Sequence, residues 1–276
     1  MYSVAHIIDI GLKKENNEDA ILIDDRVGLF VVADGMGGHE RGEVASRIVV
    51  DSFKEAFSND EDSTITYSNE DAFDDDETVP YMLNEEDDET VAYDEFNDEI
   101  YINNILNSVV EHSTKKIVNY VKERRIAGQI GTTVVGLYQI KDVERMAVFH
   151  LGDSRAYRIR DNSIVKLTVD HSKYEQMKQS GKYTSEQLAK VNRNSITKAI
   201  GNFRVMPLEI NYFTLKKEDI YIVCSDGVSD LVHASELLEI ITKEINNLDK
   251  ATIRIKNLVY ERGAKDNLSM IVFRYR

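Results

Sequence analysis

The first third of the chain contains short apolar runs separated by polar residues, followed by segments in which apolar residues recur at helical spacing. Ser3–Asp9, Ala20–Ile23 and Leu29–Ala33 are expected to be β-strands, because apolar residues alternate with polar ones or fill a short β-branched run. Apolar residues at helical spacing follow in Glu43–Phe57 and recur in Ile102–Ile126. We expect these two helices to lie antiparallel on one face of a sheet.

The chain after Gly131 has the pattern of an antiparallel β-region. Turn residues separate most of the next apolar runs, which we expect to be strands. These runs are Thr132–Gln139, Arg145–His150, Ala156–Arg160, Ile164–Leu167, Leu208–Thr214 and Ile220–Cys224. Helices at Ser235–Asn246 and Lys250–Arg262 then precede a closing strand at Ser269–Arg274. Strand runs with helices at their ends, instead of strict strand–helix alternation, indicate an α+β sandwich.

A polar stretch from Asp170 to Asn194 interrupts these strands and has few apolar anchors. It predicts one short helix in a mobile flap beside a functional site. The sequence leaves open whether the part of the flap around Tyr174–Thr184 contacts a ligand there.

The acidity of the chain belongs to one segment. The 276 residues carry a formal net charge of −15, but residues 58–100 hold 18 Asp and Glu and no Lys or Arg. The other 31 acidic and 34 basic residues leave the rest of the chain at about +3. With 42% apolar residues available for a core, we expect residues 1–276 to form a single domain that contains residues 58–100 as a disordered insert.

The composition disfavours several classes of protein. No apolar run approaches the roughly 18 residues of a membrane span, and the N-terminus lacks a signal-peptide layout. The single cysteine, Cys224, cannot form an internal disulfide and is expected to be a small buried hydrophobe. Nucleic acid repels an acidic chain unless a basic patch is segregated. We expect a cytoplasmic monomer that binds neither membrane nor nucleic acid, with His150 and His171 in structural roles.

Aspartates recur in turns at the ends of apolar runs or helices. The turns are VVADGMGG with Asp34, FHLGDSR with Asp153, IVCSDGVSD with Asp226 and GAKDNLSM with Asp266. One Asp-Gly turn is ordinary, but these turns together would bring unpaired carboxylates close to one another. That arrangement destabilises a fold unless cations or arginines neutralise it. Hard oxygen ligands without a His/Cys cluster favour Mg²⁺ or Mn²⁺ over zinc.

These turns lie in a longer series of motifs that resembles a known family. In order from Gly11 to Phe273 the motifs are GLKKENNEDA, VVADGMGGHERGEVAS, GTTVVG, HLGDSRAYRIRDN, LTVDHS, ITKAIG, YIVCSDGVSDLV and KDNLSMIVF. The series is similar to the bacterial form of the metal-dependent type 2C (PPM) serine/threonine protein phosphatases. The resemblance covers nearly the whole chain outside the acidic insert. It implies a four-layer α/β/β/α sandwich of two antiparallel sheets flanked by helix pairs.

The resemblance also implies a centre of two Mn²⁺ or Mg²⁺ ions, with a third and weaker ion beside it. Asp34 would bridge the two ions, and a larger residue at Gly35 would crowd the ion and the turn. The implied metal-binding residues are Asp34, the backbone carbonyl of Gly35, Asp226, Asp266, Glu18 through bound water, and Asp153 with Asp226 for the third ion.

The activity implied by the resemblance is hydrolysis of phosphoserine and phosphothreonine on proteins. Two cations about 3.5–4 Å apart lower the pKa of a bridging water and neutralise the phosphoryl oxygens. No protein nucleophile is then required, so we expect direct attack of water and no phosphoenzyme. Phosphoprotein substrates and an opposing bacterial Ser/Thr kinase are the implied partners.

The chain departs from the family pattern at basic and histidine positions. Lys14 stands where the family has the phosphate-binding arginine; it keeps a positive charge but loses the bidentate fork. Lys198 also replaces a usual arginine. Met36 stands where eukaryotic relatives have a candidate general acid. His39 could take that role, and capping of the following helix is an equal alternative.

The acidic insert contains a repeated heptad, EDSTITY, DDETVPY and DDETVAY. We expect Thr64, Thr78 and Thr90 to be phosphoacceptors for a partner kinase, and the phosphorylated heptads to bind a forkhead-associated domain protein. Chance repetition in a low-complexity segment and autoinhibition by substrate mimicry are the alternatives. A calcium loop is excluded, because no glycine supplies the sharp turn.

Two other functions compete with a protein phosphatase. A catalytically weak pseudophosphatase could keep the fold and act as a scaffold that binds a phosphothreonine-reading partner through the insert. Such a protein would have no physical reason to keep uncompensated carboxylates together. A phosphatase of small metabolites is disfavoured by the lack of a motif for a deep pocket.

Overall fold

The computed structural model of the protein describes residues 2–37, 41–57, 95–141 and 143–276. Most of the acidic insert therefore lies outside the described residues, as do Thr64, Thr78, Thr90 and His39.

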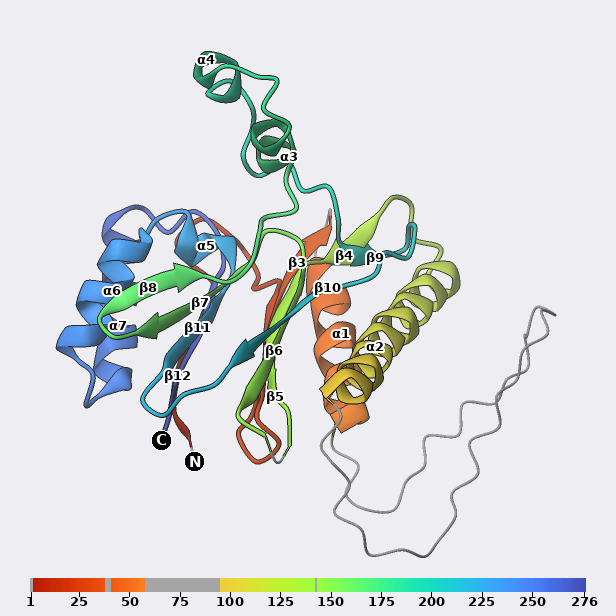
Figure 1. Ribbon diagram of the computed structural model, residues 1–276. Coiled ribbons are helices and arrows are strands. Elements are labelled where there is room, and N and C mark those ends of the chain that lie inside the picture. Colours follow the sequence, from red (N-terminus) through yellow and green to blue (C-terminus); the bar gives the residue numbers. More distant parts are fainter. Residues whose placement is uncertain (1, 38–40, 58–94, 142) are drawn as a thin grey trace, which may run out of the picture.

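Two antiparallel β-sheets form the centre of the molecule (Figure 1). One is five-stranded, in the order β1 (Tyr2–Asp9), β12 (Leu268–Tyr275), β11 (Ile220–Cys224), β7 (Arg155–Arg160) and β8 (Ser163–Lys166). The seven-stranded sheet has the order β10 (Glu209–Thr214), β6 (Arg145–Leu151), β5 (Val134–Gln139), β3 (Leu29–Gly37), β4 (Ile130–Thr132) and β9 (Ile200–Gly201), and β2 (Asp19–Asp24) pairs with β3.

A pair of helices covers the outer face of each sheet (Figure 1). Helices α1 (Gly42–Phe57) and α2 (Glu95–Glu123) pack on the seven-stranded sheet, and α6 (Ala234–Lys243) and α7 (Leu248–Glu261) pack on the five-stranded sheet. The predicted four-layer α/β/β/α sandwich is therefore confirmed. The expected antiparallel arrangement of α1 and α2 on one sheet is also present.

Strand β3 illustrates how the sequence builds these layers. Leu29 and Val31 belong to the core beneath α1 and α2, whereas Phe30 and Val32 belong to the core between the two sheets. Both faces of the strand are buried, so its sequence is a continuous apolar run instead of an alternating one. Phe30 stacks on Phe273 of the opposite sheet, with ring centroids 3.8 Å apart. This contact joins the two sheets through their aromatic side chains.

Two predicted elements were wrong in detail. The expected strand Thr132–Gln139 is divided into β4 and β5 at Thr133, whose amide donates to the Asp34 carbonyl at 2.8 Å. The flap holds two short helices instead of one, α3 (Lys173–Gln179) and α4 (Ser185–Leu188). The Ser172 and Thr184 side chains cap them, and these polar caps leave no trace in apolar periodicity.

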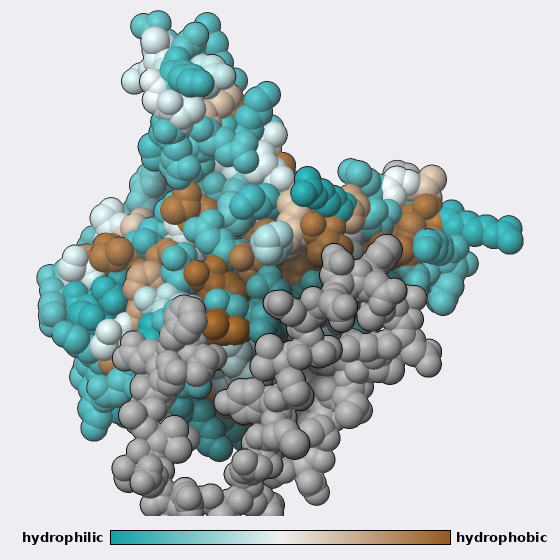
Figure 2. Space-filling view, turned by 45° about the vertical axis from the view of Figure 1, so that its right-hand side comes forward, coloured by the Kyte–Doolittle hydropathy of each residue, from teal (hydrophilic) through white to brown (hydrophobic). Residues whose placement is uncertain are grey.

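The flap stands out from the body of the molecule as a largely hydrophilic projection that carries α3 and α4 (Figures 1 and 2). The last turn of α1 and the first turn of α2 lie at the opposite end of the molecule from it (Figure 1). Among the described helices, none combines the length and apolar character of a membrane span.

Candidate metal centre

Aspartates from both sheets meet at one edge of the sandwich. Asp34 lies on β3 directly opposite Asp19 on β2. From the other sheet, Asp226 begins the short helix α5 (Asp226–Ser229) immediately after β11, and Asp266 lies two residues before β12. Asp34 and Asp226 are close enough for the charge of Asp226 to raise the pKa of Asp34, so segments 192 residues apart in sequence meet here.

Burial and mutual repulsion disfavour the charged form of these carboxyls. Burial, followed by the charges of Asp19, Asp226, Asp153 and Asp266, raises the pKa of Asp34 well above its usual value. Burial likewise raises the pKa of Asp19 and of Asp153 to about 7, and that of Asp226 to about 6. Such values mark a site that is short of positive charge.

Asp19 is a site residue that the sequence analysis missed. Its side chain is buried, and Oδ2 accepts a hydrogen bond from the Ser225 hydroxyl at 3.0 Å. The neighbouring Asp226 and Asp266 charges contribute to its raised pKa. The signal was available, because Asp19 is an acidic residue beside an apolar strand, but it lies at the start of that strand and the aspartates singled out lie in turns after apolar runs or helices.

Gly35 is required by a close approach of three backbone segments. A Cβ atom there would lie 2.3 Å from the Gly42 carbonyl oxygen and 2.4 Å from that of Glu18. The Gly35 amide donates to the Glu18 carbonyl at 3.1 Å, and the Glu18 carboxylate accepts from the Gly42 amide at 3.1 Å. Gly35 lies within β3, and not in a turn as expected, so backbone packing explains the glycine.

Asn267 holds the Glu18 segment beside the acids. Its side-chain oxygen accepts from the Glu18 amide at 2.9 Å, and its side-chain nitrogen donates to the carbonyls of Ile10 at 3.0 Å and Asn16 at 2.9 Å. Asn267 is only 3% exposed, so these hydrogen bonds are shielded from water. The motif KDNLSM contains Asn267, but its sequence alone does not reveal these distant partners.

Lys14 lies at the same edge and pairs with Asp266, with its Nζ 2.6 Å from Oδ1. Partial burial opposes its charge, but the ion pair and the nearby Glu18 and Asp34 raise its pKa. Both partners are more than a third exposed, so the pair can open at little cost.

Asp153 lies at a turn that is linked to Asp34. The Asp34 amide donates to the Thr133 hydroxyl at 3.3 Å, and that hydroxyl is 2.7 Å from the Ser154 hydroxyl. Asp153 is 5% exposed, and its Oδ1 has no hydrogen-bond partner. Asp226 is the charged neighbour that contributes most to its raised pKa.

A cleft of about 260 Å³ lies between the flap and Asp153. Tyr174 of the flap lines it, and Arg193 lies over the Tyr174 ring at 4.6 Å. The flap therefore faces the acidic edge, as the sequence predicted for its position.

His150, His171 and Glu209 form a separate cluster whose ligand atoms lie within 4.8 Å of one another. The two imidazole rings are stacked, 4.5 Å apart and 10° from parallel. An ion bound through a ring nitrogen lies in the plane of that ring, and two stacked planes share no such point. The Lys198 ammonium also lies 3.3 Å from His171 Nε2. The geometry favours the structural role expected for both histidines.

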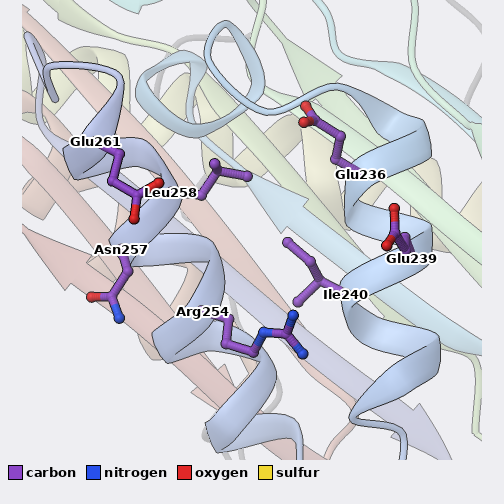
Figure 3. A pocket seen from close by; sticks show the side chains of 7 residues that line it. All are labelled: Glu236, Glu239, Ile240, Arg254, Asn257, Leu258 and Glu261. Atoms are coloured by element: carbon purple, nitrogen blue, oxygen red, sulfur yellow. The ribbon is translucent and has the colours of Figure 1, made fainter.

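A groove of about 400 Å³ runs between α6 and α7 on the outer layer (Figure 3). Its charged side chains are largely paired, Glu236 with Arg262 at 2.6 Å and Arg254 with Glu244 at 2.7 Å. The predicted site residues lie elsewhere, so the groove is not part of the acidic edge.

The donor set at the acidic edge consists of carboxylate and backbone oxygens. Asp19 Oδ1 and Asp153 Oδ1 are buried without hydrogen bonds, and the pKa values of both residues are raised. A bound cation would compensate these buried oxygens and favour the charged form of both carboxyls. Oxygen donors of this kind suit Mg²⁺ or Mn²⁺. The residues present therefore fit hard divalent cations.

A sequence profile of the family described as protein phosphatase 2C matches residues 12–261. The serine/threonine protein phosphatase PstP of Mycobacterium tuberculosis is 27% identical over 265 residues, which cover 96% of this chain and 43% of that protein. The chain thus spans less than half the length of this relative. The serine/threonine phosphatase stp of Listeria welshimeri is 24% identical over 268 residues, which cover 96% of this chain and 92% of that protein.

Solved structures share the fold. The M. tuberculosis serine/threonine phosphatase PstP/Ppp matches with a TM-score of 0.77 and 25% identity, covering 100% of this chain and 99% of that one. The Streptococcus agalactiae serine/threonine phosphatase matches with a TM-score of 0.78 and 23% identity, covering 100% of both chains. The catalytic domain of PstP in complex with two manganese ions matches with a TM-score of 0.74 and 24% identity, covering 99% of this chain and 97% of that one.

The raised pKa values predict that metal-free protein becomes less stable as the pH rises. The folded state holds protons on Asp19, Asp153 and Asp226 that the unfolded chain has released, so the free energy of unfolding falls between about pH 4 and about pH 7. In chelator we expect the melting temperature to be roughly 5–10 °C lower at pH 8 than at pH 5. Calorimetry at both pH values measures the melting temperature, and Mn²⁺ at about 1 mM should restore the melting temperature at pH 8. An equal melting temperature at both pH values in chelator would contradict the prediction.

Asn267→Ala should destabilise the protein by about 2–3 kcal/mol, because three buried hydrogen bonds of about 1 kcal/mol each are lost. Urea unfolding measures the change. The exposed Asn257→Ala on α7 is the control and should change the free energy of unfolding by less than about 0.5 kcal/mol. An equal change in the free energy of unfolding for both substitutions would show that Asn267 does not anchor the Glu18 segment.

Proposed function

The chain belongs to the protein phosphatase 2C family, and we propose that it hydrolyses phosphoserine and phosphothreonine on protein substrates. The observation that carries the proposal is the meeting of aspartates from both sheets at one edge, where burial and repulsion raise their pKa values. A phosphoryl group is itself anionic and could not approach such an edge without cations. The relatives named above are described as phosphatases, which supports catalysis over a scaffold role.

We propose that this edge holds two Mn²⁺ or Mg²⁺ ions, with a third, weaker ion beside them. The ligands would be Asp34 to both ions, the Gly35 carbonyl, Asp226, Asp266 and, through water, Glu18, with Asp153 and Asp226 for the third. When bound, the cations lower the pKa of water and neutralise phosphoryl oxygens. The catalytic domain of PstP, solved in complex with two manganese ions, supports a centre of two ions. Asp19 would keep Ser225 and the adjacent Asp226 in position through its hydrogen bond to the Ser225 hydroxyl.

Attack by water, and not by a protein nucleophile, is consistent with the chemistry of the edge. Cys224, the single cysteine of the chain, is fully buried, and burial raises the pKa of its thiol to about 12. A thiol in that state is not nucleophilic at neutral pH. We therefore propose direct hydrolysis without a phosphoenzyme.

Lys14 would bind the phosphate of the substrate. Its ammonium lies at the edge on a flexible, partly exposed side chain, and its ion pair with Asp266 keeps it charged. As a point charge it attracts a phosphate dianion but provides no paired donors. His39 as general acid remains a prediction, because it lies outside the described residues.

The partners of the acidic insert also remain proposals. Phosphorylation of Thr64, Thr78 and Thr90 by a bacterial Ser/Thr kinase would create binding sites for a forkhead-associated domain protein. Each threonine lies in the same acidic heptad with a tyrosine three residues later, which gives one module a repeated ligand. A cytoplasmic, monomeric protein is the form we propose for this function.

Hydrolysis of a phosphothreonine peptide tests the function. We expect activity with Mn²⁺, its loss in chelator, and a fall of at least about 100-fold in kcat for Asp34→Asn, because a central neutralised charge is removed. The exposed Asp25→Asn is the matched control and should retain full activity. Activity that survives both the chelator and Asp34→Asn would exclude this mechanism.

Lys14→Arg should lower KM for the phosphopeptide roughly five-fold, since a guanidinium can bind phosphate oxygens through two parallel hydrogen bonds. Steady-state kinetics measure the change, with little effect expected on kcat. The neighbouring, exposed Lys13→Arg serves as the control. The same KM in both variants would show that Lys14 does not contact the phosphate.

A further inference from the structure

The two ends of the flap are joined at His171. The His171 carbonyl accepts from the Thr197 amide at 2.7 Å, and Ser172 forms a β-bridge with Ile196. On the preceding side, the Val169 carbonyl lies 2.8 Å from His150 Nε2. The flap therefore leaves the body of the protein from a closed base, with His171 at its centre.

His171 also clamps the residue before Asp153. Its amide donates to the Gly152 carbonyl at 2.8 Å, and the Gly152 amide donates to its Nδ1 at 3.1 Å. Nδ1 must carry a lone pair to accept, so the ring proton is on Nε2, which lies 3.1 Å from Glu209 Oε2. Burial lowers the pKa of His171 to about 4, which keeps the ring neutral and Nδ1 free to accept at neutral pH.

The turn at Gly152 needs such a clamp. Its φ of +126° is a conformation that other residues rarely adopt, and a Cβ there would lie 2.5 Å from the Cβ of Thr133. The next residue, Asp153, is buried with its Oδ1 free of hydrogen bonds. The direction of the Asp153 carboxylate is therefore set by the backbone of the turn.

A second set of hydrogen bonds connects the flap base to the helix that carries Asp226. Arg155 donates to both carboxylate oxygens of Asp170, at 3.1 and 2.8 Å, and to the Ser229 carbonyl at 3.1 Å. Ser229 is the last residue of α5, which begins at Asp226. Asp170 and His171 are adjacent, so one dipeptide contacts the segments that carry Asp153 and Asp226.

We propose that His171 is a positioning residue, whose Nδ1 holds the Gly152 amide and thereby aims the Asp153 carboxylate toward Asp226 for the weakly bound cation. The inference rests on the proposed function for the presence of that cation. It extends the function by making the flap base part of the scaffold of this ion, so that the flap and the third cation respond to the same hydrogen bond.

Two substitutions at His171 test the roles of its two ring nitrogens separately. His171→Asn puts an amide oxygen near the position of Nδ1 and can still accept from Gly152. His171→Gln reaches the position of Nε2, keeps the Glu209 contact and leaves the Gly152 amide unpaired. Glu209→Gln is the matched control, because it changes the other partner of the ring and leaves the Gly152 contact intact.

Manganese titration followed by electron paramagnetic resonance measures the free ion and needs no catalysis. We expect His171→Gln to weaken the weak site by roughly 10-fold or more, the range found when an outer partner of a metal ligand is lost. The tight sites should be unchanged, and His171→Asn and Glu209→Gln should stay within about 3-fold of wild type. Wild-type affinity in His171→Gln, or an equal loss in His171→Asn, would overturn the proposal.

Nuclear magnetic resonance of the wild-type protein tests the same link without any variant. Magnesium added after the tight sites are filled should move the Gly152 amide and His171 Nδ1 resonances along one saturation curve, which Asp153→Asn abolishes. Resonances that do not move would overturn the proposal even if His171→Gln failed to fold. If the protein failed to hydrolyse the phosphopeptide but the manganese titration gave the expected result, the proposed function would be contradicted and this inference would stand. The two failures are therefore distinguishable.

Discussion

Repulsion among carboxylates at one edge of the sandwich is the constraint on which the rest of the site depends. Burial, and then the charge of neighbouring carboxylates, raises the pKa values of Asp34, Asp19, Asp226 and Asp153. A fold that gathers these groups is stabilised only with protons or cations among them. Three hydrophobic cores, one beneath each helix pair and one between the two sheets, supply the rigidity that holds the carboxylates together.

The arrangement around these carboxylates consists mostly of backbone contacts. Gly35 allows β3 to approach the Glu18 and Gly42 segments, and Gly152 allows the turn before Asp153 to pack against Thr133. In both places a side chain would occupy space that a neighbouring segment already fills. The glycines therefore bring the acidic segments close together, and the acids themselves provide the charge.

The fold was largely predictable, because burial leaves a periodic trace in the sequence. The apolar run of β3 and the helical spacing of α1 both follow from the layer that each element packs against. The division at Thr133 and the second flap helix were missed, since hydrogen bonds to Asp34 and polar caps create them. At the site, the motif acids were named in advance and lie at one edge. Asp19 and Asn267 were not, because their roles depend on partners up to 257 residues away.

The last turn of α1 and the first turn of α2 lie at the opposite end of the molecule from the flap. The strands that carry or precede aspartates of the acidic edge, β2, β3, β6 and β11, all lie outside the stretch of chain between these two helices. Evolution can thus lengthen, shorten or rewrite this connection while the catalytic apparatus stays under its own selection. Regulation encoded there can diverge between lineages at a different rate from the chemistry it governs.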